Sequence, residues 1–86
     1  MIIRFHRKFE KQVAKLKQNV YDHLELRLQL FMKDSFHPLL NNHNLTGKYK
    51  GYRSINITGD YRAIFLLVSD KEAIFVAIGT HSKLYK

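Results

Sequence analysis

The hydrophobic pattern of the chain changes its period near residue 52, and this change most limits the possible folds. In the N-terminal part, apolar side chains recur every three or four residues, as in Phe9, Val13 and Leu16. This spacing predicts amphipathic helices at about 7–18 and 20–33. Farther along, β-branched and aromatic residues dominate three runs, GYRSINIT, DYRAIFLLVS and EAIFVAIGT. These runs predict strands joined by a TG turn and by the polar SDKE segment.

A short apolar run, IIRF at residues 2–5, predicts one more strand before the helices, and the segment 37–51, with its Pro, Asn and Gly residues, predicts a loop. The element order is therefore β-α-α-β-β-β. Strands joined by short turns pair antiparallel, and we expect the two helices to pack on one face of their sheet. We predict a single α+β domain over residues 1–86, a small antiparallel sheet backed by an N-terminal helical hairpin.

The chain is strongly basic, because 15 Lys and Arg residues against 7 Asp and Glu residues give a net charge of +8. Such a field attracts polyanions, so nucleic acid is the leading candidate partner, although an acidic protein would be attracted in the same way. The absence of cysteine excludes disulfides and thiolate metal sites and favours a reducing cytoplasm. No apolar run resembles a signal peptide or a membrane-spanning helix, so we expect a cytoplasmic protein with no membrane partner.

The strand register predicts which residues share the sheet face away from the helices. A three-residue turn at 58–60 pairs Ile57 with Tyr61 and keeps the bulky apolar residues on the helix side. A symmetric turn across 69–72 makes four further pairs: Leu67 with Ile74, Ile64 with Ala77, Arg62 with Gly79, and Asp60 with His81. The outer face then carries Asn56, Arg62, Ala77, Gly79 and His81. Because alanine and glycine are small, we expect a groove beside Arg62 and His81.

His81 is the histidine whose predicted neighbours suggest chemistry. A carboxylate at Asp60 would orient the imidazole and favour its charged form. Arg62 lies one step along the same face, and an acid/base group beside a fixed guanidinium is what phosphodiester cleavage requires. An exposed histidine at a strand end is the alternative interpretation. The spacings of the five histidines match no common metal-binding pattern, so we expect no metal site.

The segment HNLTGKYKGYR interleaves cationic and aromatic residues. Lys48, Lys50 and Arg53 would neutralise phosphates, and Tyr49 and Tyr52 would stack on bases, which suits a strand of RNA. The alternative is a solvated loop whose tyrosines cover the edge of the core. From the residues alone, both interpretations stay open.

Two segments, HNLTGKYKGYRSINITGDYRAIF and VAIGTHSKLY, resemble the RelE/ParE superfamily of bacterial type II toxins, and within it the YafQ-like mRNA interferases. The resemblance covers the whole chain in length and element order and is specific at residues 43–65 and 76–85. It implies a RelE-like fold and a toxin encoded with a cognate antitoxin. It also implies a metal-independent endoribonuclease without a cofactor, which cuts mRNA in the A site of the 70S ribosome. The ribose 2′-hydroxyl attacks the adjacent phosphate in this family.

The resemblance assigns catalytic residues position by position. His81 matches the principal acid/base, and His43 and Asp60 match groups that assist it. Tyr85 stands where an aromatic residue orients or stacks on the substrate. Arg62 belongs to the GDYR sequence, which is similar to the RelE branch, where the arginine stabilises the transition state.

Two positions depart from the YafQ-like pattern, because Asn56 replaces a second histidine and Ala77 replaces an arginine. Arg62, on the same predicted face as Ala77, would supply the missing cation. Tyr61 stands where the family has tryptophan. The residues that we expect to bind RNA are Lys48, Lys50, Arg53 and Tyr61.

Two other functions remain as alternatives. A ParE-like toxin that binds DNA gyrase would share the fold and the charge but would have no reason to gather Asp60, His43 and His81. A degenerate member that binds its antitoxin or RNA without cleaving would be consistent with Asn56 and Ala77.

Overall fold

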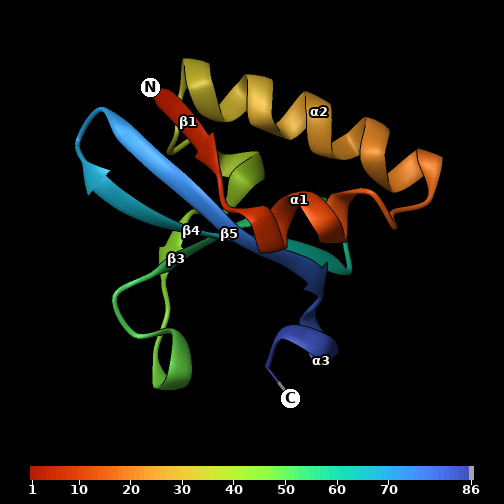
Figure 1. Cartoon of the computed structure of the whole chain (residues 1–86). Coiled ribbons are helices and arrows are strands. Elements are labelled where there is room, and N and C mark those ends of the chain that lie inside the picture. The colour runs from red at the N-terminus through yellow and green to blue at the C-terminus, as the bar shows by residue number, and fades with distance from the viewer. Residues whose placement is uncertain (86) are drawn as a thin grey trace.

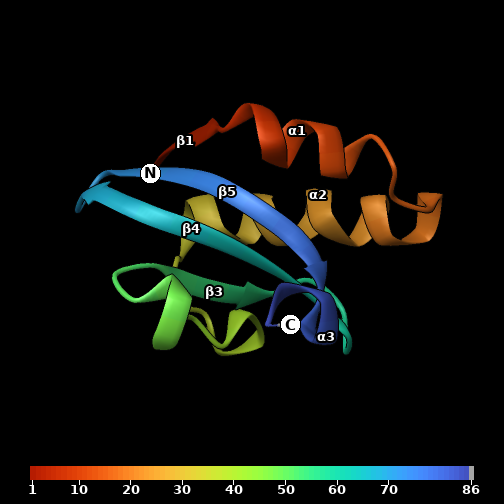
Figure 2. The same ribbon diagram turned by 60° about the horizontal axis from the view of Figure 1, so that its bottom comes forward.

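Two N-terminal helices cover one face of a five-stranded sheet in the computed structural model, which describes residues 1–85 (Figure 1). The strand order is β1-β5-β4-β3-β2. The strands are β1 (Ile2–Phe5), β2 (His43–Asn44), β3 (Arg53–Asn56), β4 (Tyr61–Ser69) and β5 (Glu72–Thr80). The helices are α1 (Arg7–Val13), α2 (Gln18–Lys33) and the short C-terminal α3 (His81–Leu84). Helices α1 and α2 lie on one side of the sheet, and α3 lies on the other (Figure 2).

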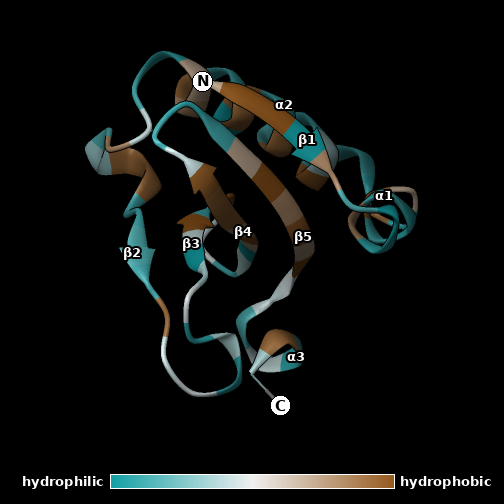
Figure 3. Cartoon of the chain, turned by 60° about the vertical axis from the view of Figure 1, so that its left-hand side comes forward, coloured by the Kyte–Doolittle hydropathy of each residue, from teal (hydrophilic) through white to brown (hydrophobic). Residues whose placement is uncertain are grey.

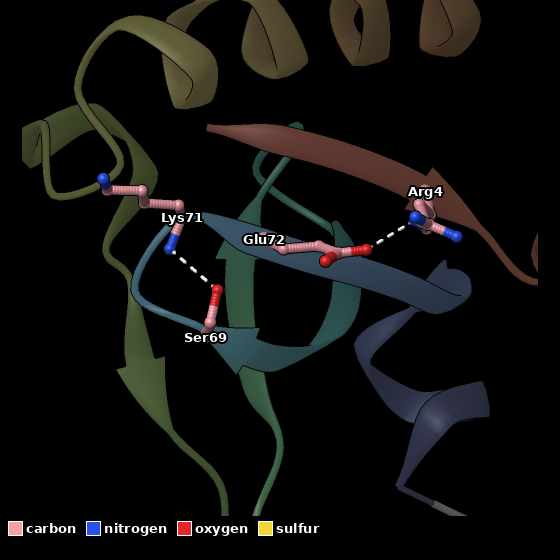
Figure 4. Close-up of polar contacts among 4 residues, drawn as sticks. All are labelled: Arg4, Ser69, Lys71 and Glu72. Atoms are coloured by element: carbon pink, nitrogen blue, oxygen red, sulfur yellow. Dashed lines mark hydrogen bonds and ion pairs between the residues drawn. The ribbon is translucent and has the colours of Figure 1, made fainter.

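The predicted α+β class with an N-terminal helical hairpin is confirmed, but the sheet is not antiparallel throughout. Strand β1 pairs parallel with β5, with Ile2 beside Glu72 and Phe5 beside Phe75. A parallel pair needs a long connection, and the rest of the chain, from α1 to β4, supplies it. An ion pair between Arg4 and Glu72 joins the two strands, next to the turn in which the Lys71 amide donates to Ser69 Oγ (Figure 4).

The helix boundaries differ slightly from the prediction. Helix α1 ends at Val13, and a tight turn in which the Leu16 amide donates to the Val13 carbonyl (3.0 Å) leads into α2. The buried side chains of α2 are Val20, Leu24 and Phe31, on one face of the amphipathic helix that the period predicted. Within residues 1–85, no helix is both long and apolar enough to cross a membrane.

The predicted loop at 37–51 contains regular structure that the pattern did not reveal. Two 3₁₀ turns, Pro38–Leu40 and Gly47–Tyr49, flank the short strand β2, which pairs with β3. The buried side chains of Leu40 and Leu45 anchor the segment on opposite faces of the sheet, each in a different apolar cluster. The pattern failed because β2 is only two residues long and has no alternation of its own.

The main core lies between the helices and the sheet, and Phe75 of β5 is at its centre. Its ring centroid is 5.6 Å from Phe9, 5.4 Å from Phe31 and 5.1 Å from Phe65. All four rings are buried. Apolar residues concentrate along β4 and β5 (Figure 3). Burying one such ring contributes about 1.5–3 kcal/mol, so this cluster holds the helices on the sheet.

A β-bulge in β5 changes which side chains face outward. Ile64 pairs with Ala77, but the next residue of β4, Phe65, pairs with Phe75, so Val76 has no partner in β4. Phe75 packs in the helix-side core, whereas Val76 and Ala77 both belong to a cluster on the outer face. Bulges break the alternation of a strand in this way.

The bulge explains where the predicted register holds and where it fails. The Ile57 amide donates to the Tyr61 carbonyl (2.9 Å), so the three-residue turn is confirmed. The pairs of Ile64 with Ala77, Arg62 with Gly79, and Asp60 with His81 are also confirmed. The pair of Leu67 with Ile74 is wrong, because Leu67 lies beside Ala73, on the far side of the bulge.

The outer face of the sheet carries a second, smaller core. Its buried members are Leu45, Ile64, Ala77 and Leu84, and its partly buried members are Tyr49, Tyr52, Val76 and Tyr85. Helix α3 packs there with Leu84 next to Gly79, where an added Cβ would lie at ordinary contact distance, 3.5 Å from Leu84 Cγ. The predicted groove on this face is therefore partly filled by aromatic and aliphatic side chains.

We predict that Gln12→Ala destabilises the protein by about 1–3 kcal/mol, the usual cost of a buried unpaired polar group. Strand β1 ends before the last residues of β5, and Gln12 Oε1 of α1 accepts a hydrogen bond (2.9 Å) from the amide of Ile78, which is 3% exposed. Chemical denaturation measures the change. Gln29→Ala, at an exposed position of α2, is the matched control and should change the free energy of unfolding by less than about 0.5 kcal/mol. Equal effects of the two substitutions would contradict this role of Gln12.

Candidate functional site

A pocket of about 250 Å³ opens on the outer face of the sheet. It lies among β2, β3, the start of β4 and α3. We call it the histidine pocket, and its lining residues are His43, Asn44, Leu45, Thr46, Ser54, Arg62, His81 and Tyr85. Four side chains that the sequence singled out for catalysis, from distant parts of the chain, thus line one pocket: His43, Arg62, His81 and Tyr85.

The pairing of β2 with β3 positions His43 opposite Ser54. Its Nδ1 lies 2.8 Å from the Asn41 carbonyl oxygen. A carbonyl only accepts, so Nδ1 carries the proton, and in the neutral ring Nε2 has the free lone pair. His43 is therefore oriented as a base. His37 has the opposite arrangement, because its Nδ1 accepts from the Leu39 amide (3.1 Å) and caps a 3₁₀ turn outside the histidine pocket.

His81 lies at the start of α3, on the rim of the histidine pocket. Its amide donates to the Asp60 carbonyl (3.1 Å), which fixes the backbone, and its exposed ring packs on Tyr85 with centroids 4.7 Å apart. Within residues 1–85, the Asp60 carboxylate makes no hydrogen bond to the imidazole and does not line the pocket. The expected contact between carboxylate and imidazole is thus absent, and the tyrosine ring orients His81 instead.

Arg62 is held by backbone carbonyls. Its Nη1 donates to the carbonyls of Thr58 (3.0 Å), Gly59 (3.1 Å) and Tyr61 (3.1 Å). In the described part of the chain, none of these contacts involves Nη2, and no carboxylate pairs with the guanidinium. A side chain fixed by one nitrogen keeps its charge and its other donors for an anion in the pocket.

Tyr85 lines the histidine pocket with a partly buried phenol. Burial raises its pKa above 10.0, while the Ser54 hydroxyl and the Arg62 charge act in the opposite direction. The phenol is therefore protonated at neutral pH and can donate a hydrogen bond. Ser54 Oγ is buried, and among residues 1–85 it has no hydrogen bond of standard geometry.

The residues predicted to bind RNA divide into two groups. Lys48 and Lys50 are exposed in the segment after β2. Arg53 instead donates to the side-chain oxygens of Asn42 (2.7 Å) and Asn44 (2.6 Å) and lies over the Phe36 ring, so it holds the β2 segment against β3. Tyr61 packs against the helix-side core and does not line the histidine pocket.

The two family departures have different surroundings. Asn56 pairs with Arg62 across β3 and β4, and its buried Oδ1 has no hydrogen-bond partner in the described part of the chain. Ala77 is 2% exposed within the outer cluster. Sequence reasoning did not assign Ser54 to the site, because its place in the pocket depends on β2, the strand that the pattern did not reveal. Within residues 1–85, no three His, Asp or Glu side chains are grouped as metal ligands.

The fold of the chain indicates the class of protein, and the family follows from a separate comparison. The chain superposes with a TM-score of 0.74 on a chain of the RelB-RelE antitoxin-toxin complex from Methanococcus jannaschii, at 19% identity and covering 95% of this chain and 94% of that one. At this identity the likeness shows the fold alone, which is that of the RelE-like toxins.

The family follows from the sequence as a whole. A family model described as "Bacterial toxin of type II toxin-antitoxin system, YafQ" matches residues 1–86, so the chain belongs to the YafQ family of type II toxins. It is 24% identical to YafQ from E. coli strain BL21(DE3), with a TM-score of 0.82 over 98% of this chain and 97% of that one. It is 25% identical to a chain of the E. coli DinJ-YafQ toxin-antitoxin complex, with a TM-score of 0.79 and coverage of 98% and 96%. No curated protein sequence matches the chain.

We predict that Arg62→Gln raises the pKa of Tyr85 further, because the positive charge that favours the phenolate is lost. NMR titration of the tyrosine Cζ resonances above pH 9 follows this group directly. Lys33→Gln removes the same charge from the end of α2 and should leave the titration of Tyr85 unchanged. An unchanged titration of Tyr85 in Arg62→Gln would show that the guanidinium does not act on this phenol.

Proposed function

We propose that this toxin is an mRNA endoribonuclease that acts on the translating ribosome in the cytoplasm. The observation that carries the proposal is the convergence of His43, Arg62, His81 and Tyr85 on one pocket of a strongly basic chain. The combination includes two proton-transfer groups, a fixed cation and a neutral phenol, which are the groups that an internal attack on a phosphodiester needs.

In the proposed reaction, the ribose 2′-oxygen loses its proton and attacks the adjacent phosphorus. The bond from phosphorus to the 5′-oxygen of the next nucleotide breaks, and that oxygen receives a proton, which leaves a 2′,3′-cyclic phosphate. His81 is the principal acid/base group. His43 assists it, because its free Nε2 lone pair suits proton abstraction.

The remaining groups bind and orient the substrate. Arg62 stabilises the charge that develops on the phosphate oxygens. Tyr85 stacks on a base or donates to the phosphate, and it also orients the His81 ring. Asp60 positions the general acid/base through its backbone, because its carbonyl accepts from the His81 amide (3.1 Å). Lys48 and Lys50 bind the RNA backbone, whereas Arg53 and Tyr61 contribute to RNA binding through the segments that they hold in place.

We also infer that a cognate antitoxin protein binds this chain. The similar E. coli chain is part of the DinJ-YafQ toxin-antitoxin complex, and the net charge of +8 favours an acidic partner. The same charge favours mRNA and ribosomal RNA, so antitoxin and ribosome would compete for the basic surface.

We predict that His81→Ala lowers the rate of mRNA cleavage on translating ribosomes on the order of 10²–10⁴-fold, the usual contribution of an acid/base group. Primer extension on translated mRNA measures the cleavage. His23→Ala, which removes an exposed histidine of α2, is the matched control and should cleave like the wild type.

Primer extension, run beside a DNA gyrase supercoiling assay, separates the alternatives. Unchanged cleavage by the His81→Ala variant would remove His81 from the mechanism. No cleavage by the wild type would favour a degenerate, non-cleaving member, which Asn56 and Ala77 would explain. Inhibition of DNA gyrase supercoiling by the wild type, without cleavage, would favour a ParE-like toxin.

A further inference from the structure

A second pocket of about 270 Å³ lies on the outer face of the sheet, and it shares no residue with the histidine pocket. We call it the lysine pocket, and its lining residues are His6, Lys8, Lys48, Tyr49, Tyr52, Val76 and Ala77. We propose that the lysine pocket binds a second nucleotide of the same single-stranded RNA, next to the step that is cleaved. This inference rests on the proposed function and adds a subsite to it.

His6 offers a fixed hydrogen-bond donor to this pocket. Its Nδ1 accepts from the Lys8 amide (3.1 Å) and caps α1. A nitrogen that accepts carries no proton, so in the neutral ring the proton is on Nε2, and Nε2–H faces away from the helix. His6 therefore presents a donor suited to a phosphate or base oxygen, which is the opposite of the base-like arrangement of His43.

The charges and the rings of the lysine pocket match a nucleotide. Lys8 and Lys48 supply two cations, and no acidic side chain is among the lining residues. Tyr49 and Tyr52 are partly buried, with centroids 6.4 Å apart, and Lys48 Nζ lies 5.2 Å from the Tyr49 centroid. Cations beside aromatic faces are the combination that binds single strands without strong base preference.

The β5 bulge creates the space. Because Val76 is the bulged residue, it faces outward together with Ala77, and both line the pocket. His6 reaches the same place because its amide donates to the Phe75 carbonyl (2.9 Å), just before the bulge. The small side chain of Ala77 leaves the volume open.

Aromatic contacts place the two pockets side by side. The Tyr49 ring, in the lysine pocket, lies 5.8 Å from the Tyr85 ring, which lines the histidine pocket and contacts His81. The rings of Tyr49 and Tyr85 meet nearly at right angles, at 85°. An RNA strand can therefore pass from the cleaved step, over Tyr85 and Tyr49, to the lysines.

The test measures how affinity grows with RNA length. Fluorescence anisotropy with the full chain uses 2′-fluoro RNA of two and of four nucleotides, which lacks the nucleophile and is not cut. In the wild type, the longer RNA should bind roughly tenfold more tightly, the size of one added stacking and phosphate contact. The Lys8→Gln/Lys48→Gln double variant should lose most of this gain.

A matched control isolates the pocket from the net charge. The Lys33→Gln/Lys71→Gln variant removes the same two charges from exposed positions outside the pocket and should keep the gain. His6→Asn keeps a capping side chain for α1 but lacks the Nε2 donor, and it should reduce the gain partly. An equal loss in both double variants would overturn the proposal.

A second measurement needs no variant. Titration of the wild type with uridine monophosphate should shift the NMR amide resonances of Lys8, Val76 and Ala77. The absence of these shifts would overturn the subsite, as would an acidic peptide that binds with the same dependence on Lys8 and Lys48. If ribosomal cleavage is absent but these RNA effects are present, the proposed function fails and the subsite stands. If ribosomal cleavage is intact but the longer RNA binds no more tightly than the shorter one, the subsite fails and the proposed function stands.

Discussion

The β4–β5 hairpin must be covered on both faces, and the rest of the structure depends on this constraint. On one face, Phe75 and Phe65 pack with Phe9 and Phe31 of the helices. On the other, Ile64 and Ala77 are also buried, and of the α-helices in residues 1–85 only the short α3 lies there (Figure 2). Exposing that apolar surface would cost about 25 cal/mol per Å². The chain therefore covers it with loop tyrosines and with Leu84 of α3.

The packing of these tyrosines and of Leu84 on the outer face explains why the candidate site lies on that face. Tyr85 and Tyr49 stabilise the outer face by packing, and their edges also form the walls of the two pockets. The α3 turn that brings Leu84 onto Gly79 also brings His81 to the rim. Structural and functional uses of these residues are therefore coupled, since removing an aromatic ring would both loosen the cover and reshape a pocket.

Periodicity predicted the parts of the fold that repeat: the helices, the long strands and the register at the Arg62 end of the hairpin. It did not predict the bulge, because Val76 and its neighbours are all apolar and no residue there marks a break. It also missed β2, and with it the place of Ser54. Contact-level details, such as the Asn partners of Arg53 or the tautomer of His43, depend on loop geometry that no spacing in the sequence encodes.

Asn56 and Ala77 depart from the YafQ-like pattern, and Arg62 lies close to both in the sheet: it pairs with Asn56 on β3 and lies on the same outer face as Ala77. The guanidinium of Arg62 lines the histidine pocket and is held by three carbonyls of the β3–β4 turn, so a fixed cation is present without an arginine at 77. Ala77 is buried beside the bulge at 2% exposure, and its small side chain leaves the lysine pocket open. An arginine there would fill that pocket and place its charge beside Lys8 and Lys48. In the proposed reaction, a cation at residue 62 instead of 77 would separate transition-state stabilisation from the proposed binding of the neighbouring nucleotide.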